Sequence, residues 1–322
     1  MISNQEINRR FADIMNIQTP SVSNPYFLKQ IFAMGYREEF MDFYKHIENR
    51  YENIDEFVKH QAVIREQIFN EIKEHKSYKS FNEMDMNHFK IDQDLKGLHQ
   101  SIYHERCEDC YYLSLDLKKA NFQVLKYLDP SIVKNADSYE AFISHYTDDE
   151  WIIASRAFRQ VGFGQLNGKR ISTVSKWLIG QYIKPVLNIL GCGLDHLEVF
   201  QKDEVIFKLP KMDNYKDIIS KINSIELEHP VEVHIELFKI EPWALKDGER
   251  KIETFYVKTL YDLETLLLKE YVFKGVPSKY KLIANALFFN RAMEEFFLIF
   301  DIDGIPSKML RTLQLEKIRK ED

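Results

Sequence analysis

The chain has 322 residues, of which 45% are hydrophobic and 29% are charged, and its formal net charge is −6. This length and composition predict a soluble globular protein with a substantial core, and they exclude a disordered chain. The net negative charge offers no overall attraction for nucleic acid, so a nucleic-acid partner would need a local basic surface.

Nothing in the sequence predicts secretion or a membrane partner. No apolar run reaches the roughly 18 residues of a spanning helix, and the N-terminal MISNQEINRR lacks the apolar stretch of a signal peptide. Three cysteines are too few for a disulfide framework, which favours a reducing compartment. We therefore expect a cytoplasmic protein. The many Lys, Ile, Asn and Tyr residues suit an AT-rich genome such as some viruses have, and a viral protein would lie in the host cytoplasm.

The N-terminal third is predicted to be mostly helical. IDEFVKHQAVIREQIFNEIKEH (54–75) places its apolar residues on one helical stripe. The polar residues 76–100 predict a connection with short helical pieces. CYYLSLDLKKANFQVLKYL (110–128) predicts a strand that leads into a helix.

Two helices are expected next. DDEWIIASRAFRQVGFGQL (148–166) predicts a helix whose N-terminus Asp148 or Asp149 can cap. A second helix is expected over residues 171–191, with a bend near Pro185, because proline disrupts a helix interior.

The remaining segments predict strands and then helices. LEVF and VIFKLP flank the polar QKDE, so residues 197–210 predict a β-hairpin. A helix is expected over 214–226, and the period-two alternation of VEVHIELFKI (231–240) predicts a strand. From Ala244 onward the pattern favours helices.

This mixture predicts an α+β fold with an antiparallel sheet rather than alternating βαβ units. We expect a mostly helical N-terminal region (1–109), a central sheet-containing region (110–245) and a C-terminal helical extension (246–322). The apolar run FFLIF (296–300) in that extension is interpreted as core, with a protein-partner surface as the alternative.

Two acids at predicted strand ends are candidate metal ligands. Asp116 falls near the end of SLDL, and Asp203 falls at the tip of the predicted hairpin. Carboxylates at strand ends of one sheet can converge on Mg²⁺, which binds one or two protein carboxylates together with substrate phosphates. For either acid taken alone, a solvated turn is the favoured interpretation.

A basic segment lies between these acids in the sequence. Residues 151–185 contain no Asp or Glu but carry several Arg and Lys, which suits phosphate groups. Arg156 and Arg159 lie one helical turn apart, and Phe163 continues that face. Cations beside an aromatic ring suit a triphosphate with a stacked base. The alternative is an amphipathic helix with a basic solvent face.

The order of these segments resembles the polymerase core of family A DNA polymerases and, more distantly, single-subunit RNA polymerases. SLDLKKANFQVLKYL is similar to the first palm motif, ASRAFRQVGFGQLNG to the finger helix, and QKDEVIFKLP to the His-Asp-Glu hairpin motif. HPVEVHIELFKIEPW is similar to the last palm strand. The resemblance covers roughly residues 110–245.

The resemblance implies a role for each matched residue. Asp116 and Asp203 would bind two Mg²⁺ ions (or Mn²⁺), with Glu204 as an auxiliary catalytic acid. Arg159 would contact the triphosphate and Phe163 the incoming nucleotide. The other implied contacts are made by Arg156, Asn121 and Asn167 to the nucleotide and by Lys169, Arg170, Lys176 and Lys202 to nucleic acid.

The chain departs from the family pattern at several positions. Asn121 replaces a Glu, and Asn167 replaces a Tyr, that help to select the sugar in the DNA polymerases. Lys202 replaces the His of the hairpin motif, and the spacing from Arg159 to Asp203 is shorter than in the family. These departures leave the choice between deoxynucleotides and ribonucleotides open.

A weaker signal concerns zinc. HQSIYHERCEDC (99–110) contains His99, His104, Cys107 and Cys110, which could bind zinc tetrahedrally. Ordinary reduced cysteines are the favoured interpretation.

The leading hypothesis is a metal-dependent nucleotidyltransferase that adds nucleotides to a nucleic-acid 3′ end. The partners would be nucleoside triphosphates and a DNA or RNA primer-template or single strand. The main alternative is a polymerase-like nucleic-acid-binding or regulatory subunit without turnover. Template-independent tailing or primer synthesis is a third alternative.

Overall fold

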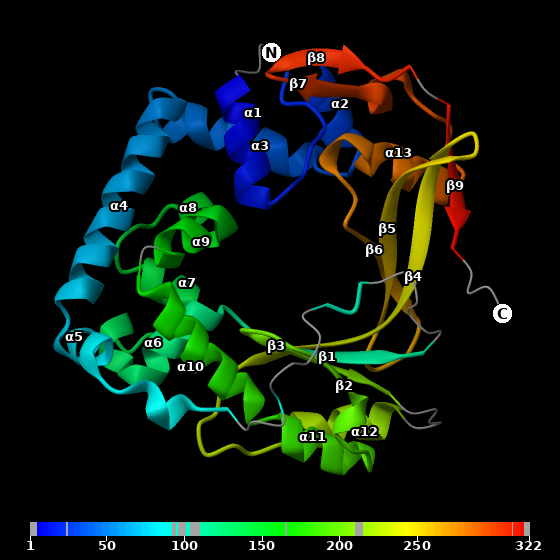
Figure 1. Cartoon of the computed structure of the whole chain (residues 1–322). Helices are drawn as coiled ribbons and strands as arrows, with labels where there is room; N and C mark the ends of the chain where they lie inside the picture. The colour runs from blue at the N-terminus through cyan, green and yellow to red at the C-terminus, as the bar shows by residue number, and fades with distance from the viewer. Residues whose placement is uncertain are drawn as a thin grey trace.

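The computed structural model describes residues 5–23, 25–91, 95, 101–103, 110–164, 166–209, 215–310 and 312–318. Helices and an antiparallel sheet are arranged in a closed ring (Figure 1). The long helix α4 forms one side of this ring, the strands β4 and β5 form the opposite side, and the rest of the sheet with its helices lies between them at the bottom. The predicted α+β fold with an antiparallel sheet is confirmed.

The N-terminal region is helical, as predicted. Asn53 starts α4 by accepting hydrogen bonds from the backbone N–H groups of Asp55 and Glu56. The buried stripe of α4 includes Phe57 and Ile64, which are members of the predicted apolar face. The helices of this region are α1 (Gln5–Met15), α2 (Tyr26–Ala33), α3 (Arg37–Arg50), α4 (Ile54–Glu74) and α5 (Lys76–Glu83).

One antiparallel sheet organises the rest of the chain. Its strand order is β2-β3-β1-β4-β5-β6, and β9 pairs with the far end of β4. The predicted hairpin at 197–210 is formed by β2 and β3, and the strand predicted at 231–240 is part of the longer β4. The strands are β1 (Tyr112–Leu117), β2 (Leu197–Phe200), β3 (Glu204–Lys208), β4 (Val233–Asp247), β5 (Arg250–Tyr261), β6 (Leu268–Lys274) and β9 (Leu313–Lys317).

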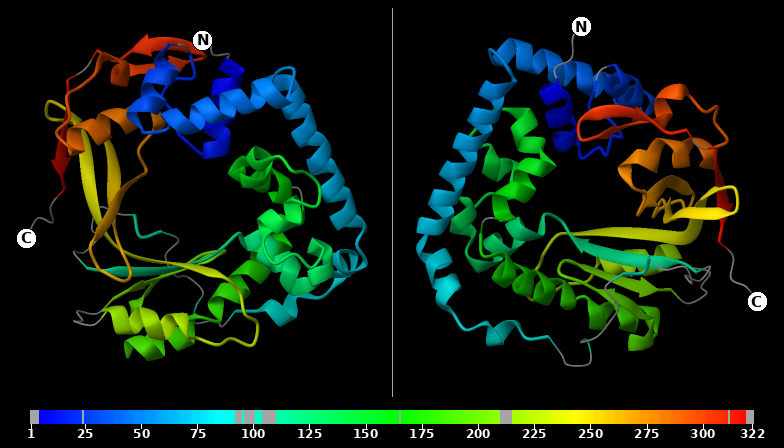
Figure 2. Two further views of the ribbon diagram at one scale, coloured as in Figure 1. Left: turned by 180° about the vertical axis from the view of Figure 1, so that it is seen from behind. Right: turned by 45° about the horizontal axis from the view of Figure 1, so that its top comes forward.

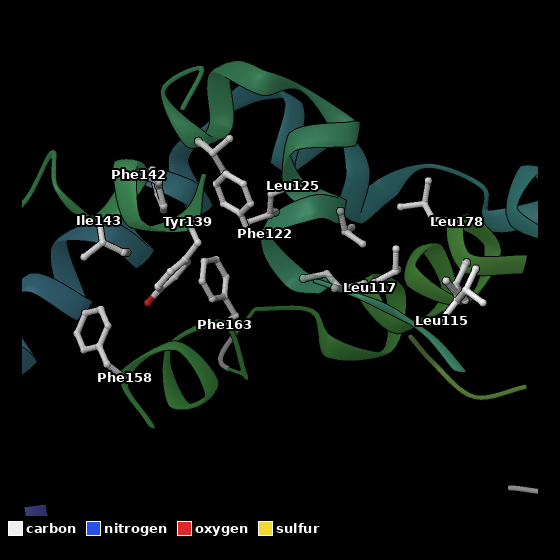
Figure 3. Packing of buried hydrophobic residues seen from close by; sticks show 14 of the residues in the cluster. Leu115, Leu117, Phe122, Leu125, Tyr139, Phe142, Ile143, Phe158, Phe163 and Leu178 are labelled. Atoms are coloured by element: carbon white, nitrogen blue, oxygen red, sulfur yellow. The ribbon is translucent and has the colours of Figure 1, made fainter. Parts of the chain in front are cut away.

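Helix α10 (Gly168–Gly180) packs against β1 and β3 and covers one face of the sheet, and other helices between β1 and β2 pack around it. Their apolar side chains join those of β1, such as Leu115 and Leu117, in a continuous core (Figure 3). This core also includes Phe11 and Phe57, so the N-terminal helices and the sheet share it. The helices are α6 (Ala120–Leu128), α7 (Tyr139–Ile143), α8 (Glu150–Ala154), α9 (Arg156–Gly164), α10 (Gly168–Gly180) and α11 (Ile183–Leu190); α12 (Tyr215–Asn223) follows β3.

Two predicted helices are each divided in the structure. The helix predicted over 148–166 is interrupted at Ser155, which has an extended backbone and whose hydroxyl accepts the N–H of Phe158. Asp149 caps the first half, as expected. The next helix breaks before α11 rather than at Pro185, because Pro185 occupies the first turn of α11, where no backbone N–H donor is needed.

The prediction of a helical C-terminal extension is wrong. β4 continues past Ala244 and forms a long ladder with β5, in which Ile240 faces Lys258 and Trp243 faces Phe255. This pairing supplies the backbone hydrogen bonds that a helix would otherwise make, and tertiary pairing overrides local propensity. One helix, α13 (Ser278–Phe288), lies in this region, followed by the hairpin of β7 (Ile299–Ile302) and β8 (Ile305–Lys308).

The C-terminal region has its own buried cluster. Leu245, Phe255 and Ile283 lie at its centre, and Phe297 of the FFLIF run joins them with 8% of its surface exposed. The interpretation of Phe297 as a core residue is therefore confirmed. No helix in the described part of the chain is both long and apolar enough to cross a bilayer.

The ring closes where the N-terminal segment meets the C-terminal hairpin (Figure 2). The Asp301 carboxylate accepts hydrogen bonds from the Ser21 hydroxyl at 2.7 Å and from the Val22 N–H at 2.9 Å. The Gln30 side-chain amide donates to the carbonyl oxygens of Phe296 and Ile299, both at 2.9 Å. These bonds join residues 266 to 280 positions apart in the sequence.

We predict that Asp301→Ala lowers the free energy of unfolding by about 2 kcal/mol, since it removes two hydrogen bonds to a carboxylate. Urea unfolding followed by circular dichroism measures this loss. Glu249→Ala, which removes an exposed acid in the turn between β4 and β5, is the matched control and should be neutral. Equal stability of the two variants would show that the closure is not held by Asp301.

Candidate active site on one face of the sheet

The register of β1 decides where the first candidate ligand lies. Asp116 is directly opposite Glu204 of β3 on one side and His234 of β4 on the other. Directly opposite residues of an antiparallel pair place their side chains on the same face. Ser114, two residues earlier, lies opposite Glu236 on that face. The polar side chains of three neighbouring strands are therefore gathered on the face opposite the helices.

The hairpin turn brings the second candidate ligand to the end of β1. The N–H of Gln201 donates to the carbonyl oxygen of Glu204 at 2.9 Å, which closes the turn between β2 and β3. The N–H of Leu117 donates to the carbonyl oxygen of Asp203 at 2.8 Å. Asp203 is thus hydrogen-bonded to the residue next to Asp116, and the two acids that the sequence analysis singled out lie side by side.

The electrostatics of the two acids reflect this crowding. Burial, followed by the charges of Asp203, Glu204 and Glu236, raises the pKa of Asp116 to about 7. Burial also raises the pKa of Asp203, against the opposing effects of its backbone hydrogen bond and of Lys202. A half-buried carboxyl with a pKa near neutrality is typical of a functional site.

The other two carboxylates on this face have partners. Glu204 accepts a hydrogen bond from the Ser114 hydroxyl at 2.6 Å. Glu236 forms an ion pair with Lys258, which is only 5% exposed, and lies 3.4 Å from the His234 ring nitrogen Nε2. Burial alone would raise the pKa of Glu236, but Lys258 and His234 outweigh burial and lower it.

A small apolar cluster adjoins the acids. Ile102 packs there with Ile206 and Phe238, and the ring of Tyr103 lies tilted against that of Tyr256 with ring centroids 5.6 Å apart. Burial and the charges of Glu204 and Glu236 raise the pKa of the Tyr103 hydroxyl. The segment at 101–103 therefore reduces the exposure of this face to water beside the carboxylates.

The donor set fits Mg²⁺ or Mn²⁺. All the donors are oxygens, and two adjacent carboxylates are the usual protein contribution to a magnesium site that is completed by water and phosphate. A cation would also relieve the repulsion that raises the pKa of Asp116. Within the described residues, no group of three or more His, Cys, Asp or Glu side chains is positioned to hold a metal by itself.

The two arginines of helix α9 have different neighbours. Arg156, at its start, is exposed and lies close enough to Lys274 of β6 for its charge to lower the pKa of that lysine. Arg159 instead lies over the Tyr139 ring at 5.5 Å, and its charge lowers the pKa of Glu140. Of the pair, Arg156 is therefore associated with the sheet and Arg159 with the helical body.

The expectation that Phe163 packs against a nucleotide does not agree with its position. Its side chain is 3% exposed, and its ring lies 6.0 Å from that of Tyr139 (Figure 3). The ring is part of the helical core, because α1 and α4 pack against α9 and Tyr139 of α7 contacts the ring. A stacking surface at Phe163 would require α9 to move.

The other expected contacts are spread around this centre. Asn167 caps α10 and donates to the side chain of Asn82, and Arg170 bonds the carbonyl of Met84. These two residues thus fasten α10 to the segment around α5. Lys176 lies over the Phe200 ring at 4.4 Å. Asn121 is half-buried at the start of α6, whereas Lys169 and Lys202 are exposed.

Sequence reasoning missed three members of the site: Ser114, Glu236 and Lys258. The alternation of VEVHIELFKI carried a usable signal for Glu236, because it shares the face of His234 while Val233, Ile235 and Leu237 occupy the other. Lys258 was missed because its strand was expected to be helical. Of the four candidate zinc ligands, His99, His104 and Cys107 lie outside the described residues.

No protein-family model matches the chain, and no curated protein or solved structure matches it either. The resemblance to family A polymerases therefore stays a prediction from the sequence motifs.

We predict that Asp116→Asn stabilises the protein increasingly as the pH rises. Folding raises the pKa of Asp116 from its ordinary 3.8 to about 7, so its ionised form is less favourable in the folded state. This cost is absent below about pH 4, grows from there to about pH 7 and is constant above. Thermal melts should therefore show a larger gain in Tm for the variant at pH 8 than at pH 5.

The fully exposed Asp137, replaced by Asn, is the control for the loss of one negative charge. It should show little change in Tm at either pH. A gain for Asp116→Asn that is the same at both values would mean that the carboxyl is not perturbed in the folded protein.

Proposed function

We propose that the chain is a metal-dependent nucleotidyltransferase that joins a nucleoside triphosphate to the 3′ end of a nucleic acid. The observation that carries this proposal is the meeting of Asp116 and Asp203 at the ends of β1 and the β2–β3 hairpin. Those are the two motifs in which the family keeps its metal-binding acids. The expected partners remain nucleoside triphosphates and a DNA or RNA strand.

The reaction would be an in-line displacement at the α-phosphorus. The 3′ hydroxyl gives up its proton to water as its oxygen forms the new bond to phosphorus, the bond to the bridging oxygen of the β-phosphate breaks, and pyrophosphate leaves. When bound, two divalent ions would stabilise the charge on the attacking and leaving oxygens. Asp116 and Asp203 would hold these ions, and Ser114 would hold Glu204 in position beside them.

A second candidate function is a nucleic-acid-binding or regulatory subunit without turnover. The burial of Phe163 and the orientation of Arg159 toward Tyr139 favour it, because both remove contacts that the family uses to hold the incoming nucleotide. Binding of a primed strand without incorporation of any labelled nucleotide would support this candidate. Protein partners of the C-terminal region also remain a proposal.

We predict that Asp116→Ala and Asp203→Ala each lower nucleotide incorporation by at least about 100-fold, because each removes an ion ligand at the reacting phosphate. The assay uses labelled dNTPs and NTPs with Mg²⁺ or Mn²⁺, on primed and on unprimed strands. Products on unprimed strands would assign template-independent tailing or primer synthesis. Asp137→Ala should retain activity, and full activity in either site variant would contradict the assignment.

We also predict that Mg²⁺ or Mn²⁺ raises the Tm of the wild-type protein at pH 8. A ligand present at 100 times its Kd stabilises the folded state by about 2.7 kcal/mol. The double variant with Asp116→Asn and Asp203→Asn should lose this shift, whereas Asp137→Asn should keep it. This measurement does not depend on turnover, so a metal-dependent shift without incorporation would point to the second candidate function.

A further inference from the structure

A cavity lies where the N-terminal helices meet the C-terminal region. It has a volume of about 420 Å³, within the range of small-ligand sites of roughly 300–1,000 Å³. The segments at the ends of α1 and α2 form one wall, and β6 and α13 form the other; α2 and α13 are neighbours in Figure 1. Phe297 also lines the cavity, next to Phe296, whose carbonyl oxygen accepts from Gln30. The cavity therefore adjoins the contact that closes the ring.

This cavity is separate from the sheet face that carries Asp116. None of its described lining residues belongs to β1, β3 or β4. Helix α13 packs on the face of β5 that carries Phe255 and Val257. Lys258, the next residue of β5, points to the other face, where it pairs with Glu236. A ligand in the cavity is consequently independent of the proposed nucleotidyltransferase site.

The outer edge of β6 contributes backbone groups to the cavity. β6 is the last strand of the sheet, and its ladder is formed with β5. Four consecutive residues of β6, at positions 270–273, line the cavity. Successive side chains of a strand point to opposite faces, so a cavity that reaches all four meets the strand at its edge. The N–H and C=O groups along such an edge are available to a ligand.

A half-buried lysine without a partner faces the cavity. Lys281 and Asn285 lie one turn apart on α13, and both line it. The Lys281 ammonium makes no ion pair or hydrogen bond with any residue in the described part of the chain. Burial, followed by the charge of Lys274, lowers the pKa of Lys281. An ammonium that burial disfavours and no carboxylate balances would be stabilised by a bound anion.

The charge balance of the lining also favours an anion. Arg291 is a second cation there, and its guanidinium lies over the Phe289 ring at 5.1 Å. Glu270, which is exposed, is the acid among the described lining residues. Two cations thus face one carboxylate, and the exposed carboxylate keeps its contact with water.

Aromatic rings supply the apolar part of the lining. Tyr271 and Phe273 both line the cavity, and both pack against Phe288 of α13, with ring centroids 5.1 Å and 5.3 Å apart. Met34 lies on the opposite wall, beyond the end of α2. Packing against Phe288 fixes the two rings, so they offer an apolar surface that a flat ligand can cover without first ordering it.

We propose that this cavity binds a small anion that carries an apolar ring. Its anionic group, a carboxylate or a phosphate, would pair with Lys281 and bond the Asn285 amide. Its ring would lie against Tyr271 and Phe273. Because the walls belong to both terminal regions of the chain, the bound ligand would strengthen the contact that closes the ring.

Isothermal titration calorimetry of the whole protein, in buffer with EDTA, tests the ligand class. Benzoate is the carboxylate probe and adenosine monophosphate is the phosphate probe. Benzamide and adenosine are their neutral counterparts, and acetate and inorganic phosphate lack the ring. We expect at least one ring-bearing anion to bind about tenfold or more tightly than its neutral counterpart and its bare anion. The tighter of the two probes would assign the anionic group.

Lys281→Met tests the residue that carries the proposal. This variant keeps most of the side-chain length and should weaken binding of the anionic probe by at least about tenfold. It should melt no earlier than the wild type, since it removes a charge that burial disfavours. Lys279→Met removes an exposed lysine of the same helix, whose ammonium lies over the Tyr280 ring, and should keep the affinity. Lys281→Arg should restore most of it.

Two results would overturn the proposal. One is a wild-type protein that binds neither benzoate nor adenosine monophosphate more tightly than the neutral counterparts. The other is equal affinity in Lys281→Met and Lys279→Met. The double variant with Asp116→Asn and Asp203→Asn separates the two sites, because it should keep the affinity for the anionic probe even where nucleotide incorporation is lost. Loss of the probe in that variant would place it at the carboxylates and count against the cavity.

Discussion

The pairing of β1 between β3 and β4 is the constraint on which the candidate site depends. Leu113, Leu115 and Leu117 face the helices, so the register of β1 is fixed by burial of its apolar side. The same alternation places Ser114 and Asp116 on the other face. A slip of one residue would expose the leucines to the polar face and bury the aspartate in the core. Hydrophobic packing on one side of the sheet thus positions the carboxylates on the other.

That position has an electrostatic cost, which the fold offsets only in part. Glu236 is neutralised by the buried Lys258, and Glu204 is held by the Ser114 hydroxyl. Among the residues that the structure describes, no basic side chain forms an ion pair with Asp116, and burial and the neighbouring acids raise its pKa to about 7 against the effect of Lys258. A set of buried carboxylates that all have cationic partners would form a purely structural network. The set on this sheet face instead keeps negative charge that no paired cation balances. The unmet charge is the physical reason to expect a cation at Asp116 and Asp203.

The sequence predicts the central part of the fold better than its C-terminal part. The strand ending near Asp116, the hairpin around Asp203 and the strand following Pro230 were predicted from short apolar runs, from the polar residues between them and, in the last strand, from period-two alternation. The pattern after Ala244 misled because its apolar residues suit a helix locally, while pairing with β4 decides the outcome. Phe163 was assigned to nucleotide binding because its helical spacing places it on the same helix face as Arg159. Spacing alone does not show whether other helices cover that face.

The strands that the sequence did not predict connect the central sheet directly to the C-terminal region. β4 begins beside Asp116 at Val233 and ends in the C-terminal cluster at Asp247, so one continuous strand joins both cores. β5 returns along it and carries Lys258 back to Glu236. The C-terminal region is therefore an extension of the same sheet rather than a separate appendage. Because the hydrogen bonds of Asp301 and Gln30 fasten that region to the N-terminal segment, the acids lie on a framework that is closed by contacts between the two terminal regions of the chain.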